Sequence, residues 1–147
     1  MKRLIVALTT VVFSSCQASA PPPGAGEAQG TSVAAEGGML ATERESYAAG
    51  EPVRLVLDNQ SDDPLGANLC MATLERREEQ RWVGVPAPSD EVCTAELRVV
   101  FPGGQLSHEF RFREDLASGE YRFRTRVENS TTNVDTDEVS NSFQLRR

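Results

Sequence analysis

The stretch "EYRFRTRVEN" (120–129) decides the fold class of this chain, because two kinds of side chain alternate strictly along it. Tyr121, Phe123 and Val127 stand at alternate positions, and the positions between them carry mostly arginine. Successive side chains of a β-strand point to opposite faces, so the pattern predicts a strand with one buried and one solvated face. The stretch "PVRLVLDN" (52–59) has the same alternation and predicts a second strand of this kind.

Short strands separated by turn residues are predicted along the rest of the chain from Met39 onward. In "HEFRFRED" (108–115), Phe110 and Phe112 are predicted to face the interior. The other strand candidates are residues 67–77, 80–85, 95–101 and 141–147, and the turns are residues 48–52, 59–66, 77–80, 86–91, 102–105 and 116–120. Seven to eight short strands at this spacing predict an all-β domain built as an antiparallel β-sandwich.

Three segments carry a family resemblance: "MLATERESYAAGEPVRLVLDNQSDDPLG" (39–66), "LCMATLERREEQRWVGV" (69–85) and "FPGGQLSHEFRFREDLASGEYRFRTRV" (101–127). Together they look like a bacterial immunoglobulin-like domain of the kind found in small exported lipoproteins. The resemblance implies an immunoglobulin-like antiparallel β-sandwich of seven to eight strands over residues 38–147, and a location outside the cytoplasm. It implies no reaction, because proteins that share such a fold perform many unrelated functions.

Tyr121, in "SGEYRFR" (118–124), is similar to a tyrosine corner of immunoglobulin-like domains. In that feature the phenol hydroxyl bonds to the backbone a few residues upstream and fixes a crossover between the sheets. An ordinary inward-facing core tyrosine is the alternative.

Residues 1–15 have the form of a signal peptide, with a basic pair followed by a short apolar run. The motif "FSSC" (13–16) resembles a bacterial lipobox, although Phe13 stands where leucine is usual, and it predicts lipidation of Cys16. Cleavage after Ala20 is the alternative, but Pro21 would then follow the cut and disfavours the extended conformation of a scissile bond. Residues 16–37, rich in proline, glycine and alanine, are predicted to be a disordered tether.

The charge of the chain excludes one class of partner. There are 15 basic and 22 acidic residues, a formal net charge of −7. Nucleic-acid binding draws most of its affinity from a basic surface, so we expect no nucleic-acid partner.

Cys70 and Cys93 remain when Cys16 is set aside, and an even cysteine count in an exported chain predicts a disulfide. A redox-active pair is the alternative, but such pairs normally have C-x-x-C spacing at a helix N-terminus, which is absent from the sequence. The bridge is therefore predicted to be structural.

Arginines at alternate positions form the most patterned polar feature. Arg122, Arg124 and Arg126 share one face of their predicted strand, and two more, Arg111 and Arg113, lie on the strand before it. Neighbouring strands of this kind belong to opposite sheets, so the five arginines are not expected to form one patch. The alternatives for the set of three are cross-strand pairing with acids such as Glu43, Glu45 and Glu75, and binding of an anionic partner.

No residue pattern in the sequence predicts an active site. His108 is the only histidine, no ligand partner stands near it in sequence, and we interpret it as a surface residue. The acidic stretch "NVDTDE" (133–138) lacks calcium-loop spacing and is predicted to be a solvated loop. Trp82 is predicted to pack at the edge of the core. We therefore expect no catalytic residue, no metal, no cofactor and no enzymatic activity.

The function predicted from the sequence is that of a binding or accessory module in the cell envelope. The chain would be held to a membrane through lipidated Cys16 and would bind an unknown protein or envelope polymer. A secreted protein is the alternative location. A proteinase inhibitor that presents residues 84–93 as a rigid loop is the alternative function, because prolines and Cys93 would lower the cost of ordering that loop.

Overall fold

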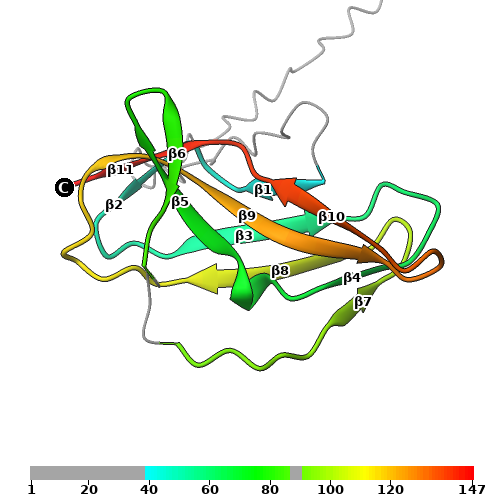
Figure 1. Cartoon of the computed structure of the whole chain (residues 1–147). Coiled ribbons are helices and arrows are strands. Elements are labelled where there is room, and N and C mark those ends of the chain that lie inside the picture. Colours follow the sequence, from blue (N-terminus) through cyan, green and yellow to red (C-terminus); the bar gives the residue numbers. More distant parts are fainter. Residues whose placement is uncertain (1–38, 87–90) are drawn as a thin grey trace, which may run out of the picture.

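The computed structural model describes residues 39–86 and 91–147 and arranges them in eleven strands and one 3-10 helix (Figure 1). The elements are β1 (Leu40–Thr42), β2 (Ser46–Ala48), β3 (Val53–Asp58), β4 (Leu65–Ala67), η1 (Leu69–Met71), β5 (Thr73–Glu78), β6 (Arg81–Gly84), β7 (Arg98–Val100), β8 (Gln105–Phe110), β9 (Gly119–Asn129), β10 (Val134–Val139) and β11 (Phe143–Arg146). Within these ranges no helix has the length and hydropathy needed to cross a membrane. The predicted signal peptide, Cys16 and the tether lie outside the described residues.

Two sheets face each other and form an all-β sandwich, as predicted. The small sheet has the order β1-β3-β8 and is antiparallel throughout. The large sheet is organised around β9, with β10 and β11 along one side and β5 and β4 along the other. Outside these strands, β6 pairs with β5, β7 pairs with β4, and β2 pairs with β11. The pairing of β2 with β11 is parallel, and among the described strands it is the one exception to the predicted antiparallel arrangement. Strands β8 and β9 lie in opposite sheets, as expected.

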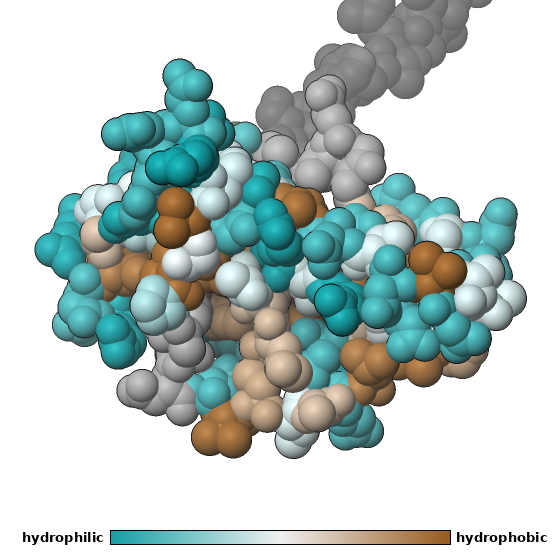
Figure 2. Space-filling view, in the orientation of Figure 1, coloured by the Kyte–Doolittle hydropathy of each residue, from teal (hydrophilic) through white to brown (hydrophobic). Residues whose placement is uncertain are grey.

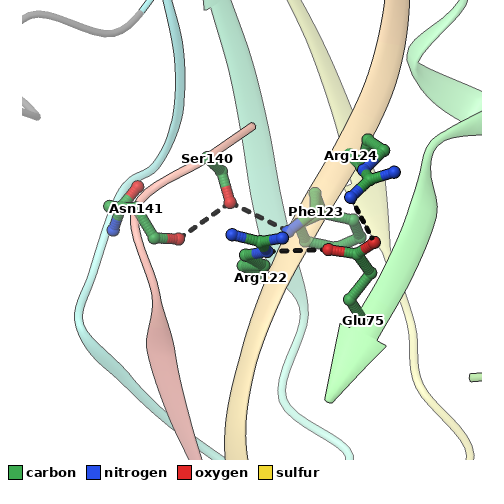
Figure 3. A network of polar contacts seen from close by, with 6 residues as sticks. All are labelled: Glu75, Arg122, Phe123, Arg124, Ser140 and Asn141. Atoms are coloured by element: carbon green, nitrogen blue, oxygen red, sulfur yellow. Dashed lines mark hydrogen bonds and ion pairs between the residues drawn. The ribbon is translucent and has the colours of Figure 1, made fainter. Parts of the chain in front are cut away.

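The described strands outnumber the seven to eight predicted because one predicted strand is interrupted, the stretch 133–138 predicted to be a loop forms a strand, and β1 and β2 precede β3 where no strand was named. Residues 67–77, predicted as one strand, form β4 and β5 with η1 between them. Strands β10 and β11 both pair with β9 and are separated at Ser140. The Ser140 hydroxyl accepts a hydrogen bond from the backbone N–H of Phe123 at 2.9 Å and donates one to the carbonyl of Asn141 at 2.8 Å (Figure 3). The Ser140 side chain thus replaces a backbone acceptor where the strand ladder is broken, and the N–H of Phe123 keeps a hydrogen-bond partner.

Alternating side chains build the core, which confirms the pattern read from the sequence. On β3, Val53, Leu55 and Leu57 are fully buried, and on β9 Phe123 and Val127 face them from the other sheet. The aromatic rings are in direct contact: those of Phe110 and Phe123 stack with centroids 4.6 Å apart, and Phe112 and Phe143 complete the cluster. Burying each such side chain contributes about 2 to 3 kcal/mol.

Tyr121 is a tyrosine corner. It is fully buried, and its hydroxyl donates a hydrogen bond to the backbone carbonyl of Ala117, four residues upstream, at 2.6 Å. The bond fixes the path by which the chain enters β9.

Asn141, which lies between β10 and β11, connects the two sheets. Its side-chain oxygen accepts a hydrogen bond from the backbone N–H of Thr42 at 2.7 Å, and its side-chain nitrogen donates to the Thr42 hydroxyl at 3.0 Å. Because Thr42 ends β1 of the small sheet, this pair holds the first strand against the C-terminal part of the large sheet.

The turn between β2 and β3 is held by a carboxylate. Glu51 accepts a hydrogen bond from the backbone N–H of Ala48 at 2.8 Å and forms an ion pair with Arg44. The Ala48 N–H and the Arg44 guanidinium lower the pKa of Glu51 below 4.5. The guanidinium of Arg44 also lies over the ring of Tyr47, which links the turn to the core.

The acidic stretch 133–138, predicted to be a loop, is instead strand β10, and that prediction is wrong. The turn before it is uncharged: the side chain of Asn129 accepts hydrogen bonds from the backbone N–H groups of Thr131 and Thr132, at 2.9 and 3.0 Å. Asn129 also donates to Asp63 at 3.0 Å and thereby lowers the pKa of Asp63 below 3.8. Since β9 offers an edge next to this turn, the acidic residues pair with it as a strand despite their low strand propensity.

Candidate functional site

The outer face of the large sheet carries the three arginines singled out in the sequence. Arg122 donates from Nε to one oxygen of Glu75 at 2.7 Å, and an Nη of Arg124 forms an ion pair with the other oxygen at 3.1 Å (Figure 3). Arg126 lies 3.7 Å from Asp135 of β10. Each of the three therefore has an acidic partner, and the structure favours cross-strand pairing as their role.

Glu75 is the centre of this network and is only 6% exposed, although it projects from the outer face of β5. Arg122 covers it and is itself packed on Trp82, with the guanidinium carbon 4.3 Å from the ring centre. Trp82 is thus half-buried on the outer face rather than at the edge of the core as predicted, and it contacts a cation that is already neutralised. Binding of an anionic partner by these arginines stays a prediction.

Arg111 and Arg113 stand apart from the β9 arginines. They follow β8 in the small sheet and pair with Glu109 and Asp115, so no patch of five arginines forms, as expected.

A groove crosses the outer face beside the arginines, and it was not predicted from the sequence. Its volume is about 480 Å³, and it lies over Gly66 of β4. A side chain at this position would project into it, because a Cβ on Gly66 would lie in ordinary contact with the side chain of Leu97, at 3.6 Å. Apolar residues form part of its wall, while charged residues form its rim; the lining residues are Gly66, Asn68, Met71, Ala95, Leu97, Thr125, Arg126, Glu128 and Asp135.

Strand β7 borders this groove and exposes large apolar side chains. Val99 pairs with Gly66 and shares its outward face, and Leu97 and Phe101 stand two residues to either side. The exposed fractions are 48% for Leu97, 56% for Val99 and 68% for Phe101. Figure 2 shows the apolar surface over β7 along the lower edge of the molecule. The sequence signal was present in "LRVVF" (97–101), where apolar residues occupy both faces of a strand.

The position of β7 is fixed by a buried asparagine. The side chain of Asn59 is fully buried and donates hydrogen bonds to the carbonyl of Val100 at 2.8 Å and to that of Asp63 at 2.9 Å. Strand β7 pairs with β4 along one edge, and within residues 39–86 and 91–147 nothing pairs with its other edge. The strand is therefore held in place along one edge, and its other edge is open to a further strand.

A second feature lies at the opposite face of β4, around His108. His108 is partly exposed, as predicted, and its ring lies over the inner face of β8, where the residue pairs with the buried Leu55 and contacts Phe110 edge to face at a centroid distance of 4.6 Å. Its Nε2 lies 3.2 Å from a carboxylate oxygen of Glu91. The sulfur of Cys70 lies within 4.8 Å of the ligand atoms of both residues. No ligand partner stands near His108 in the sequence, but the fold brings Glu91 and Cys70 beside it from distant parts of the chain.

The predicted disulfide is confirmed. Cys70 of η1 is bonded to Cys93, and their Cα atoms are 5.7 Å apart. The bridge joins η1 to the segment that leads to β7. The loop 84–93, named as the inhibitory loop of a proteinase inhibitor, includes residues 87–90, which lie outside the described residues, so that function stays a prediction.

No protein-family model matches the sequence, and the comparison with curated proteins found no match. Among solved structures, the chain is similar to neutral ceramidase from Pseudomonas aeruginosa, with 15% identity and a TM-score of 0.45, over 75% of this chain and 19% of that one. A ceramidase complexed with C2 is matched with 15% identity and a TM-score of 0.39, over 72% of this chain and 18% of that one. The chain thus spans less than a fifth of either ceramidase.

These neighbours are chains of an enzyme, which contradicts the prediction that this chain is not an enzyme. That prediction relied on the absence of a catalytic pattern along the sequence, and such an argument does not test residues that only the fold brings together. It is wrong in that form. The likeness is too distant and too partial to carry an activity over to this chain.

Proposed function

We propose that this chain is a binding module of the cell envelope, and that it binds an extended apolar segment of a partner protein along β7. The observation that carries this proposal is the row of exposed apolar side chains, Leu97, Val99 and Phe101, on a strand whose outer edge has no partner among the described residues.

An open edge strand with apolar side chains is a site that proteins normally protect, because it can pair with any other strand. Charged or proline residues are the usual protection, and β7 has a single charge, Arg98. A partner strand added here would gain main-chain hydrogen bonds to β7, and its side chains would cover the apolar row.

The groove over Gly66 supplies specificity in this arrangement. A side chain of the partner strand that points toward the sheet can enter the groove between Leu97 and Met71. The ion pair of Arg126 and Asp135 stands at the rim, where it can bond to polar groups of the partner. Apolar floor and charged rim are the usual anatomy of a protein-binding site.

The envelope location is part of the proposal and is supported by the sequence. The predicted signal peptide (1–15), Cys16 at the lipobox-like motif and the tether (16–37) would hold the domain near a membrane surface. The Cys70–Cys93 disulfide suits an oxidising compartment. Mass spectrometry of the mature N-terminus tests the anchor: we expect an acylated cysteine at residue 16, whereas a chain that starts at Pro21 would contradict it.

Site-specific crosslinking tests the binding surface. A photoreactive amino acid is placed at Val99 or Phe101 in producing cells, and the matched control carries it at Glu109, an exposed residue of β8 in the other sheet. We expect one adduct of the same mass from positions 99 and 101 and none from 109. Absence of an adduct, equal yield from 109, or an adduct with the mass of two copies of this chain would each contradict the proposal.

A further inference from the structure

Four potential metal ligands meet in a cavity behind β4. The cavity has a volume of about 250 Å³, and its lining includes Cys70, Glu91, Cys93 and His108. We propose that these four side chains form a zinc site that becomes available when the Cys70–Cys93 disulfide is reduced.

The distances suit one ion bound by all four side chains. The ligand atoms of Cys70, Glu91 and His108 all lie within 4.8 Å of one another, and the sulfur of Cys93 is bonded to that of Cys70. In a tetrahedral zinc site with bonds of about 2.0 to 2.3 Å, ligand atoms are about 3.3 to 3.8 Å apart. The side chains therefore need to shift by about 1 Å, which rotation about their own bonds provides.

The backbone already holds the four residues at suitable positions. The Cα atoms of the two cysteines are 5.7 Å apart, close enough for both sulfurs to reach one ion. His108 lies on β8 with its ring packed against Phe110, and its Nε2 faces Glu91 at 3.2 Å. The imidazole is thus oriented before any metal arrives, which lowers the cost of binding.

The chemistry of the set favours zinc. Two thiolates, one imidazole and one carboxylate are the ligand types of four-coordinate zinc sites. With the disulfide formed, only His108 and Glu91 can act as ligands, and two ligands bind zinc weakly. The disulfide therefore blocks the site, and its reduction opens it.

The switch requires a dithiol reductant. A thiolate of the reductant attacks one sulfur of the bridge, the bond between Cys70 and Cys93 breaks, and a disulfide forms in the reductant. Two electrons and two protons pass to the two cysteines, which become thiols. Zinc then replaces the two thiol protons, which are released to solvent.

The test measures zinc affinity of the full chain with the disulfide intact and after reduction under anaerobic conditions. Every sample carries Cys16→Ser, so that the third thiol cannot contribute. Zinc is titrated in competition with a chromophoric chelator, and cobalt is used as a spectroscopic substitute because sulfur-to-cobalt charge transfer reports bound thiolates. We expect one equivalent bound tightly by the reduced chain, with tetrahedral cobalt bands, and at least a hundredfold weaker binding when the disulfide is intact.

Variants separate this site from chelation by two thiols alone. His108→Gln and Glu91→Gln are each expected to weaken zinc binding at least tenfold, while Glu96→Gln, which alters another residue of the same cavity, leaves it unchanged. If His108→Gln binds zinc as tightly as Glu96→Gln, the proposal is wrong. Circular dichroism and thermal melting are recorded for each sample: a reduced chain that zinc stabilises supports the site, and one that zinc neither binds nor refolds contradicts it.

Discussion

Glu75→Gln is the most informative single change on the outer face of the large sheet. The carboxylate is buried, accepts a hydrogen bond from Arg122 at 2.7 Å and forms an ion pair with Arg124 at 3.1 Å. A glutamine keeps the shape and one acceptor oxygen but removes the charge that both guanidinium groups face. Hydrogen bonds to a charged group are each worth about 1.5 to 3 kcal/mol. Because Arg124 is 45% exposed, its share is screened to about 0.5 kcal/mol.

The expected loss is therefore about 2 to 3 kcal/mol of unfolding free energy, which corresponds to a fall in Tm of about 8 to 12 °C. Urea denaturation and thermal melting measure it. The matched control is Glu120→Gln, which removes the same charge from β9 at a position with no ion pair among the described residues. The change also frees two arginines, so binding to an anionic polymer should increase. A Glu75→Gln chain as stable as the Glu120→Gln control would refute the reasoning about the network.

Three further changes test other parts of the fold. Tyr121→Phe removes the corner hydrogen bond and should cost about 1 to 2 kcal/mol in urea denaturation, with no change in binding. Loss of the bridge in Cys70→Ser/Cys93→Ser opens a loop with a sequence separation of 23 and should cost about 3 kcal/mol, whereas an unchanged midpoint would show that the bridge adds nothing. Because the pKa values of Glu51 and Asp63 are lowered in the folded state, both ionised carboxylates stabilise the fold fully above pH 4.5. This stabilisation is lost as the pH falls through their pKa values in the folded state. Stability should therefore decline below pH 4.5, and less steeply in Glu51→Gln.

Alternation along the chain was sufficient to predict the strands that form the core. Residues 52–59 and 120–129 face the interior as expected because a half-buried strand leaves a period of two in the sequence. The pattern failed where other forces decide the structure. Residues 67–77 contain the turn η1, which is closed by its own backbone hydrogen bonds and carries the disulfide at Cys70, and the acidic β10 forms because β9 provides an edge for it.

The candidate sites could be predicted less well, because they consist of residues that only the fold brings together. Glu91 and His108 lie on different segments, and their contact depends on how the chain between Cys93 and β8 is folded. The groove lies over Gly66, which in the sequence is typical of an ordinary turn residue. The pairing of the β9 arginines with Glu75, in contrast, was among the alternatives that the strand pattern offered.

The most direct test of the proposed function combines the crosslinker at Phe101 with a charge on β7. The adduct yield is measured in chains with Val99→Lys and with the control Glu109→Lys, which places the same charge on β8. We expect Val99→Lys to abolish the adduct, because a lysine at the centre of the apolar row opposes burial beneath a partner strand. Glu109→Lys should leave the yield unchanged. A yield that survives Val99→Lys, or that falls equally in both variants, would contradict binding along β7.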